Sequence, residues 1–230
     1  MRCAVGAADM LETLVTDAAT DPDRRTPSFF LGARALDRIE QAVVIVLFCF
    51  LAARLWPEDV SAVSFARVLL LISEGAVVVF LVIRRPTERI SLRPGDWFLA
   101  TAGTFLPLMV VSGDFRPLPE FGAMLLLAGT LIHIGAKFSL NRSFGLVAAN
   151  RGVKSEGLYR IVRHPMYAGY MLAHVGFFLT QGSLLNLGLY AAIWTLLVLR
   201  IRAEERVLFE DAAYQEFAAG VRYRLLPGVF

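Results

Sequence analysis

Six apolar runs constrain the fold of this chain more than any other feature of its sequence. A helix needs about 20 apolar residues to cross the roughly 30 Å hydrocarbon core of a bilayer. Backbone groups in lipid must find their hydrogen-bond partners within the segment, so each run is predicted to be a helix. The runs are Ile39–Trp56, Val60–Ile83, Trp97–Ser112, Leu118–Leu140, Met166–Gln181 and Leu184–Leu199.

Only Gly182 and Ser183 separate the last two runs, which leaves room for a tight turn between antiparallel helices and for nothing longer. The predicted fold class is therefore all-α: a polytopic membrane helix bundle of four spans plus a C-terminal helical hairpin. A hydrophobic content of 57% with 19% charged residues agrees, because a soluble domain carries more charge. We expect a polar N-terminal leader (1–37), the first membrane helices (38–116) and a C-terminal region (117–230).

The basic residues indicate how the helices are oriented. They gather in the leader and at Arg38 directly after it, in the connection at 84–93, in the loop at 137–165 and in the C-terminal tail from residue 200. Of the 23 basic residues, only Arg54, Arg67 and Arg116 lie elsewhere. Because cytoplasmic loops of membrane proteins are enriched in Lys and Arg, both termini and the 137–165 loop are predicted to be cytoplasmic. The net charge of +3 reflects this topology and gives no reason to expect nucleic-acid binding.

Several other classes of protein are disfavoured. Cys3 and Cys49 are too few and too far apart for a disulfide framework or a cysteine metal site. His133, His164 and His174 lack the close spacing of a zinc motif, so no protein-bound metal is expected. No inverted repeat is visible, which argues against a transporter of that architecture.

The loop from Asn141 to Pro165 is a candidate site because long loops are usually functional or disordered. Its glycines Gly145, Gly152 and Gly157 are not spaced as GxGxxG, and no strand precedes them, so a Rossmann site is not indicated. A solvated basic loop on the membrane surface fits the composition equally well.

The motif RHPMY at 163–167 opens the fifth apolar run. Pro165 suits the first turn of a helix, and His164 before it is held out of helical geometry. Free amides at such a helix start can receive a carboxylate or a phosphate. Taken alone, Tyr167 fits an interfacial aromatic anchor and Arg163 a snorkelling charge.

The last apolar run continues into the charged sequence LRIRAEERVLFE at 199–210. Arg200 and Glu204 lie four residues apart and share a helix face, but in the weaker order for simple helix stabilisation. A site and a solvated face are both compatible with this pattern.

Four ionisable groups inside apolar runs receive structural assignments. His133 and His174 are expected to be neutral and to share a hydrogen bond with a neighbouring helix. Glu74 and Arg67, seven residues apart, are compatible with a buried pair or with the lining of a cavity.

These features follow one another in a fixed order: a glycine-rich loop, GLYRIVRHPMYAGY at 157–170, Asn186, then RxRAEExxL and a terminal YRLLP. In this order the chain resembles the isoprenylcysteine carboxyl methyltransferases and, more distantly, the phospholipid N-methyltransferases. The similarity covers roughly residues 120–228. It departs at Asn141, where a glycine is usual, and at the tail sequence EDAAYQEF.

The resemblance implies methyl transfer from S-adenosylmethionine, which would be held in a cytoplasmic pocket of the catalytic region, 117–230. It implies that Arg200 is catalytic and faces the carboxylate of the substrate, and that Glu204 receives the ammonium group of the cofactor. The cofactor-binding residues that it implies are His164, Pro165, Met166, Tyr167, Tyr159, Arg151, Gly152, Val153, Lys154 and Glu204.

The expected acceptor is a lipophilic carboxylate, such as a prenylcysteine-like compound or a lipid-modified substrate taken from the bilayer. Three alternatives remain: a phospholipid amine as acceptor, an NADPH-dependent sterol-type reductase, and a non-catalytic membrane scaffold. Short loops and the lack of an organelle retention signal favour a bacterial inner membrane.

Overall fold

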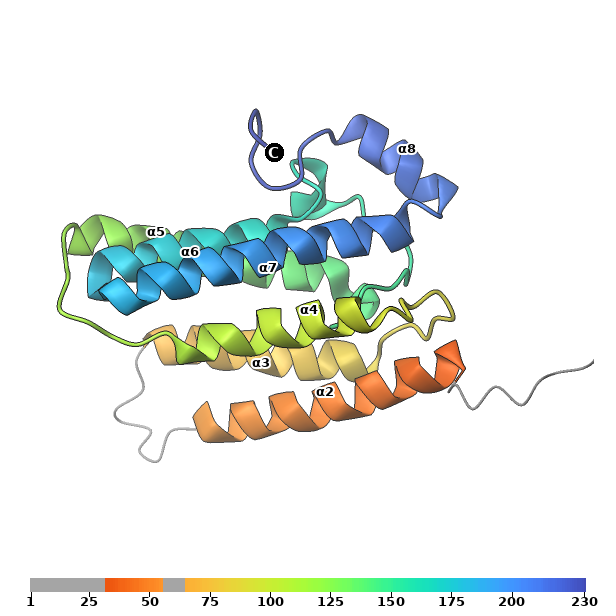
Figure 1. Ribbon diagram of the computed structural model, residues 1–230, viewed down its shortest axis with the longest axis horizontal. Helices are drawn as coiled ribbons and strands as arrows, with labels where there is room; N and C mark the ends of the chain where they lie inside the picture. The colour runs from red at the N-terminus through yellow and green to blue at the C-terminus, as the bar shows by residue number, and fades with distance from the viewer. Residues whose placement is uncertain (1–31, 56–64) are drawn as a thin grey trace, which may run out of the picture. The chain divides into compact units, whose positions relative to one another are not determined.

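The computed structural model describes residues 32–55 and 65–230, and within these residues the chain is helical. Two isolated β-bridges are the only strand-like pairings there, so the predicted all-α class is confirmed. The predicted leader lies outside the described residues as far as residue 31. The α-helices are α2 (Ala33–Leu55), α3 (Phe65–Val82), α4 (Pro94–Phe105), α5 (Pro119–Leu140), α6 (Pro165–Gln181), α7 (Leu184–Leu208) and α8 (Ala212–Gly220), shown in Figure 1.

Proline and one aspartate set where several helices begin. Pro94, Pro119 and Pro165 each stand at the start of a helix, where the missing N–H costs no hydrogen bond and the fixed φ suits the first turn. Asp211 caps α8 by accepting a hydrogen bond from the backbone N–H of Ala213 at 3.0 Å. The long helices run side by side and α8 lies beyond the end of α7 (Figure 1).

Helices α5 and α6 are antiparallel and pack along a seam of glycines. A Cβ on Gly129 would meet the carbonyl oxygen of Gly169 at 2.7 Å, and a Cβ on Gly176 would meet that of Gly122 at 2.6 Å. No real Cβ approaches backbone so closely, so only glycine permits this contact. Small residues at helix interfaces have this role in membrane proteins, because they let two backbones come together.

The turn between α6 and α7 is as short as predicted, with Gly182 and Ser183 between the helices. The segment before α5 pairs with this turn through hydrogen bonds between Phe115 and Gly182 at 2.9 and 3.2 Å. Asn186, which is fully buried, binds both the N–H and the C=O of Val111 through its side-chain amide. These contacts fix the end of the bundle where α7 begins.

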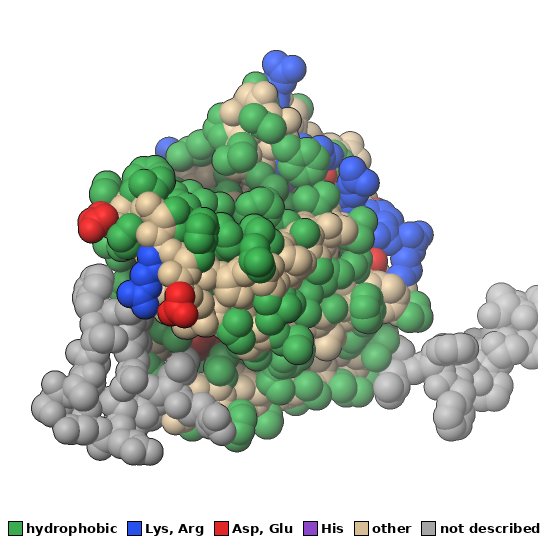
Figure 2. Space-filling view, turned by 60° about the vertical axis from the view of Figure 1, so that its left-hand side comes forward, with side chains coloured by type: hydrophobic (Ala, Val, Ile, Leu, Met, Phe, Trp, Pro, Cys, Tyr) green, Lys and Arg blue, Asp and Glu red, His purple; other side chains and the backbone are tan. Residues whose placement is uncertain are grey.

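Many apolar side chains lie on the outside of the helices, and Figure 2 shows them over much of one face. Exposed large apolar side chains occur on α2, α3, α4, α5 and α7, but none on α6, which therefore lies inside the bundle. Soluble proteins rarely expose continuous apolar surface of this extent. The segments Pro119–Ser143 and Leu184–Leu208 are apolar and, at 25 residues each, extend about 37 Å, enough to cross a bilayer. Among the described residues, these two helices are thus long and apolar enough to cross a membrane, in agreement with the membrane bundle predicted from the sequence.

The predicted span Trp97–Ser112 is wrong in its bounds. Helix α4 begins at Pro94 and ends at Phe105, so its 12 residues extend only about 18 Å. Pro107 cannot continue the helix, because it lacks an N–H and its ring would collide with the carbonyl of Gly103. The chain tightens there into the 3-10 turn η2, Leu106–Met109.

The other predicted runs agree more closely with the structure. Helix α2 already begins at Ala33, before the predicted run, while Trp56 and residues 60–64 lie outside the described residues. The run predicted to end at Leu199 is helical to Leu208.

Candidate active site

A hollow of about 750 Å³, including its open mouth, lies where the α5–α6 loop meets the start of α6, the end of α7 and α8. The loop contributes most of one wall and includes the 3-10 turns η3 (Asn141–Ser143) and η4 (Gly157–Arg160). The lining residues are Leu140, Ser143, Gly145, Val147, Ala149, Arg151, Gly152, Val153, Lys154, Tyr159, Arg163, His164, Met166, Tyr167, Glu204, Leu208, Tyr214 and Phe217.

Most residues predicted from the sequence to bind a cofactor meet in this hollow. The lining includes His164, Met166, Tyr167, Tyr159, Arg151, Gly152, Val153, Lys154 and Glu204. Pro165 and Arg200 do not line it, although both lie next to residues that do. The loop is not a solvated surface segment, because Phe144, Val147, Asn150 and Arg151 within it are buried.

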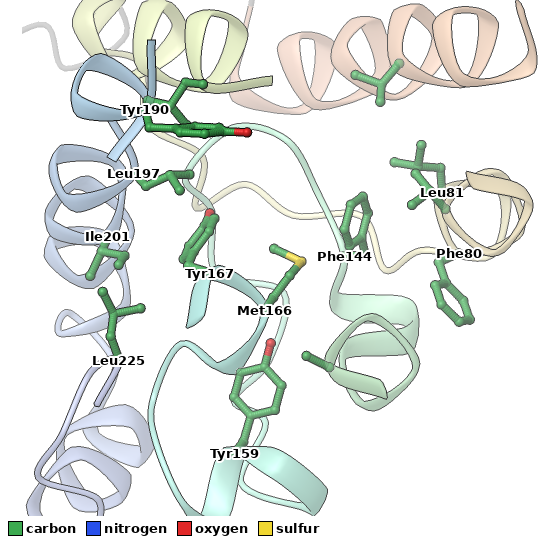
Figure 3. Close-up of a cluster of buried hydrophobic side chains, with 14 residues drawn as sticks. Phe80, Leu81, Phe144, Tyr159, Met166, Tyr167, Tyr190, Leu197, Ile201 and Leu225 are labelled. Carbon is green, nitrogen blue, oxygen red and sulfur yellow. The ribbon is translucent and has the colours of Figure 1, made fainter. Parts of the chain in front are cut away.

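The RHPMY corner is held in place by the C-terminal tail. The backbone N–H of Arg163 donates to the carbonyl of Tyr223 at 2.9 Å, and that of His164 to the carbonyl of Arg224 at 2.8 Å. With its N–H groups engaged in this way, the turn has a fixed orientation as it enters α6. Figure 3 shows the end of the Met166 side chain between Phe144 and Tyr167, with Tyr167 on the side of α7.

Glu204 presents the negative charge of the hollow. Its carboxylate accepts hydrogen bonds from the Tyr167 hydroxyl and, at 3.3 Å, from Nε of Arg200. The Glu204 side chain is 21% exposed, more than any other charged partner in this cluster. It is therefore both oriented by its neighbours and open toward the hollow.

Arg200 lies behind Tyr167, buried at 7% exposure. Its Nη2 donates to the carbonyl of Leu146 at 2.5 Å, and its guanidinium carbon lies 5.6 Å from the centre of the Tyr167 ring. Among the described residues Nη1 has no hydrogen-bond partner. The arginine thus joins α7 to the loop and keeps the N–H groups of Nη1 unused among the described residues.

Glu205 was not among the residues predicted from the sequence, yet it lies at the centre of a second cluster of charged side chains. Its carboxylate contacts Nη1 of Arg163 at 3.1 Å, Nε2 of His164 at 3.2 Å and Nε of Arg224 at 2.7 Å. Its side chain is 5% exposed. The two adjacent glutamates in RAEER could have indicated this second role. Neighbouring residues of a helix point in different directions, so Glu204 and Glu205 cannot face the same partners.

The assignment of Arg163 as a snorkelling anchor is wrong. The Arg163 side chain is 7% exposed and pairs with Glu205 across the helix interface. Glu205 compensates the charge of Arg163 inside the protein, so the Arg163 side chain does not extend to the membrane surface.

Two tyrosines outside the membrane helices are held in their neutral form. Burial, followed by the nearby charge of Glu204, raises the pKa of Tyr159 well above its usual value. Burial, followed by the charge of Glu205, also raises the pKa of Tyr214. Both rings supply uncharged aromatic wall to the hollow.

The loop residues Arg151 and Asn150 bind groups on two other elements: Arg151 pairs with Asp37 of α2, and Asn150 binds Asp211 at the start of α8. Burial, and next to it the charge of Arg84, lowers the pKa of the Arg151 guanidinium. Asn150 donates to a carboxylate oxygen of Asp211 at 2.7 Å, which ties the loop to the start of α8. Gly152 has a φ of +97°, a left-handed conformation that favours glycine.

Two ionisable groups of the membrane helices, His174 and Glu74, have structural partners, and His133 differs from them. Nδ1 of His174 accepts a hydrogen bond from the Trp194 indole on α7 at 3.3 Å, as predicted, whereas Nδ1 of buried His133 has no partner. Glu74 pairs with Lys137 on α5 at 3.4 Å, and the Arg67 side chain lies outside the part of the chain that the structure describes. Within residues 32–55 and 65–230, no group of three His, Cys, Asp or Glu side chains is placed to hold a metal.

Comparisons with known proteins single out the same region. The sequence model of the family described as phospholipid methyltransferase matches residues 120–215. Two isoprenylcysteine O-methyltransferases of Arabidopsis thaliana, A and B, are 32% and 31% identical over 113 residues, which cover 44% of this chain and 56% of each relative. The chain thus spans about half the length of these curated relatives.

A solved structure of a eukaryotic intramembrane Ras methyltransferase, an isoprenylcysteine carboxyl methyltransferase, was also found. It is 17% identical to this chain, with a TM-score of 0.45, and the match covers 86% of this chain and 77% of that one. The family match and the two plant relatives confirm the resemblance drawn from the sequence motifs.

Proposed function

We propose that this chain, whose residues 120–215 match the phospholipid methyltransferase model and resemble the isoprenylcysteine methyltransferases, is a membrane methyltransferase that uses S-adenosylmethionine. The observation that carries the proposal is that His164, Tyr167 and Glu204 line the same hollow as the loop at 151–154. The isoprenylcysteine methyltransferase names belong to the relatives, and the activity of this chain is our inference from them and from the site.

The residues of the hollow fit S-adenosylmethionine. When bound, that cofactor supplies an activated methyl group on a positively charged sulfur. Glu204 would take its ammonium group, because this is the one partly open carboxylate of the hollow. The neutral rings of Tyr159, Tyr214 and Phe217 offer apolar surface for the adenosyl part, and the backbone at 151–154 offers polar groups beside it.

The proposed acceptor is a lipophilic carboxylate, as in a prenylcysteine. Arg200 supports this choice, because its Nη1 is free among the described residues and a guanidinium can orient a carboxylate through paired hydrogen bonds. Methyl transfer to a carboxylate neutralises opposite charges, so alignment of the reactants and exclusion of water are what the protein must provide. Neither a strong base nor a metal is required for this step.

A phospholipid amine is the second candidate acceptor. The description of the matching family favours it, since that description names phospholipids. An amine must lose a proton to accept a methyl group, and Arg200 is unsuited to take it. We therefore place the carboxylate first.

The membrane orientation is part of the proposal. The basic connection at 84–93, which Arg34 contacts through Glu88, lies with the α5–α6 loop and the tail at the end of the bundle that carries the hollow. Under the positive-inside rule this end is cytoplasmic, so a soluble cofactor would enter from the cytoplasm and a lipophilic acceptor from the bilayer. Four spans plus the hairpin and a bacterial inner membrane remain our predictions.

Calorimetry on the purified protein in detergent tests the cofactor, with S-adenosylmethionine in one titration and NADPH in another. We expect heat only with S-adenosylmethionine. Binding of NADPH alone would support a reductase, and binding of neither would refute the proposal. Transfer of radiolabelled methyl groups to a farnesyl-cysteine analogue or to phosphatidylethanolamine vesicles then identifies the acceptor, and we expect label in the farnesyl-cysteine analogue.

A further inference from the structure

Four charged side chains meet in the interior between α2, the segment after α3 and the α5–α6 loop. They are Asp37 and Glu40 of α2, Arg84 and Arg151, and each is at most 2% exposed. Arg84 contacts both carboxylates, and Nη2 of Arg151 lies 2.7 Å from Asp37 and 3.6 Å from Glu40. Two negative and two positive charges compensate one another, which is the condition for burying them.

This cluster also binds the backbone of the cavity wall. Oε1 of Glu40 accepts hydrogen bonds from the N–H groups of Leu146 at 2.7 Å and Val147 at 3.3 Å. Val147 and Arg151 line the hollow. The Arg151 guanidinium lies close against Gly145, where an added Cβ would meet its carbon at 2.7 Å. The loop is therefore held at Leu146, Val147 and Arg151 by one helix that is far away in the sequence.

We infer that Asp37 and Glu40 are positioning residues that fix the loop wall at 145–154 and thereby set the affinity for the cofactor. The inference rests on the proposed function. Both residues lie before the region that the family model matches, which begins at residue 120. They contact the loop and not the hollow itself, so they act on the ligand only through the wall.

A loop that is ordered before the ligand arrives loses little conformational entropy on binding, so the ligand binds more tightly. Glu40→Gln keeps the size of the side chain and removes its charge, which leaves two guanidinium groups facing one carboxylate. If this leaves the loop ordered in about a tenth of the molecules, the Kd for S-adenosylmethionine rises about tenfold. The KM for the acceptor should not change.

Two measurements test the inference on the full chain in detergent: calorimetry with S-adenosylmethionine, and hydrogen exchange at the amides of Leu146 and Val147. Glu40→Asp is the second variant. It retains the charge but is one methylene shorter, so it loses reach to those amides. Weaker binding and faster exchange at both amides are expected for each variant.

Glu74→Gln is the matched control. Glu74 is a buried carboxylate that pairs with Lys137, and neither residue lines the hollow. We expect this variant to unfold at a lower temperature yet to bind S-adenosylmethionine like the wild type. Equal loss of affinity in the control, or unchanged affinity in both Glu40 variants, would overturn the inference.

The two hypotheses fail in different ways. If the wild type does not bind S-adenosylmethionine, the proposed function is refuted, and unchanged exchange at Leu146 and Val147 would still show that Glu40 does not hold the loop. If the wild type binds and the Glu40 variants bind equally well, only the positioning role is refuted.

Discussion

Glu204 and Glu205 are neighbours in the sequence with different predicted roles, so each serves as the control for the other. Glu204 lines the hollow, whereas Glu205 does not and instead joins Arg163, His164 and Arg224. We expect Glu205→Gln to lower the stability of the protein. We expect Glu204→Ala to abolish cofactor binding and to change stability much less.

The size of the stability loss follows from burial. The Glu205 and Arg163 side chains are 5% and 7% exposed, and removing one partner of a buried ion pair costs about 3–5 kcal/mol. Arg224 is 34% exposed, so its pair adds at most about 1 kcal/mol. Because glutamine retains one acceptor oxygen, we take about 3 kcal/mol. At about 2–4 °C per kcal/mol for a chain of this size, the Tm should fall by about 6–12 °C.

Thermal unfolding in one detergent measures the Tm of both variants, and calorimetry with S-adenosylmethionine measures binding well below the Tm. The reasoning is refuted if Glu204→Ala loses as much Tm as Glu205→Gln, because burial would then not distinguish the two carboxylates. It is equally refuted if Glu204→Ala binds the cofactor with wild-type affinity.

Three further predictions concern other parts of the molecule. Arg200→Ala should keep cofactor binding and lose turnover, measured by calorimetry and by methyl transfer; loss of binding would contradict its assignment to the acceptor. Gly176→Ala should cost about 1–3 kcal/mol by overpacking the α5–α6 seam, whereas Gly188→Ala on the exposed side of α7, with no atom within 4 Å, should not destabilise in the same unfolding assay. Hydrogen bonds from Asn150 and from the backbone of Ala213 lower the pKa of Asp211 below its ordinary 3.8, so its stabilising effect is present above that pH and is lost as the pH falls through the folded value. The Tm difference between wild type and Asp211→Ala should therefore be constant above about pH 5 and shrink below pH 3.8, and a difference that persists at the lowest pH would contradict this sign.

The resemblance to the methyltransferase family allowed much of the candidate site to be predicted, and local signals explain why its residues meet. Pro165 marks the start of α6 because it fits only the first turn, and this puts His164 and Tyr167 at the end of the bundle. Helical spacing then puts Glu204 at the same end, one turn after Arg200. The result is that nearly all the predicted residues line one hollow.

Helical spacing and proline positions could not predict the role of Glu205. Adjacent helical residues differ by about 100° around the axis, and which of the two faces the tail depends on how α7 rotates against α6. The tail itself returns from residues 222–224 to bind Arg163, a contact with no local sequence signal.

By itself, the sequence determined the all-α class, the apolar segments, the tight turn at Gly182 and the basic end of the bundle. Periodicity, length and proline positions act locally, so they can be recognised without coordinates. Only the tertiary structure decided that α5 and α6 meet along glycines and that Asp37 and Glu40 reach the loop at 146–151. These contacts join residues up to 114 positions apart, and packing alone selects such partners from many chemically equivalent ones.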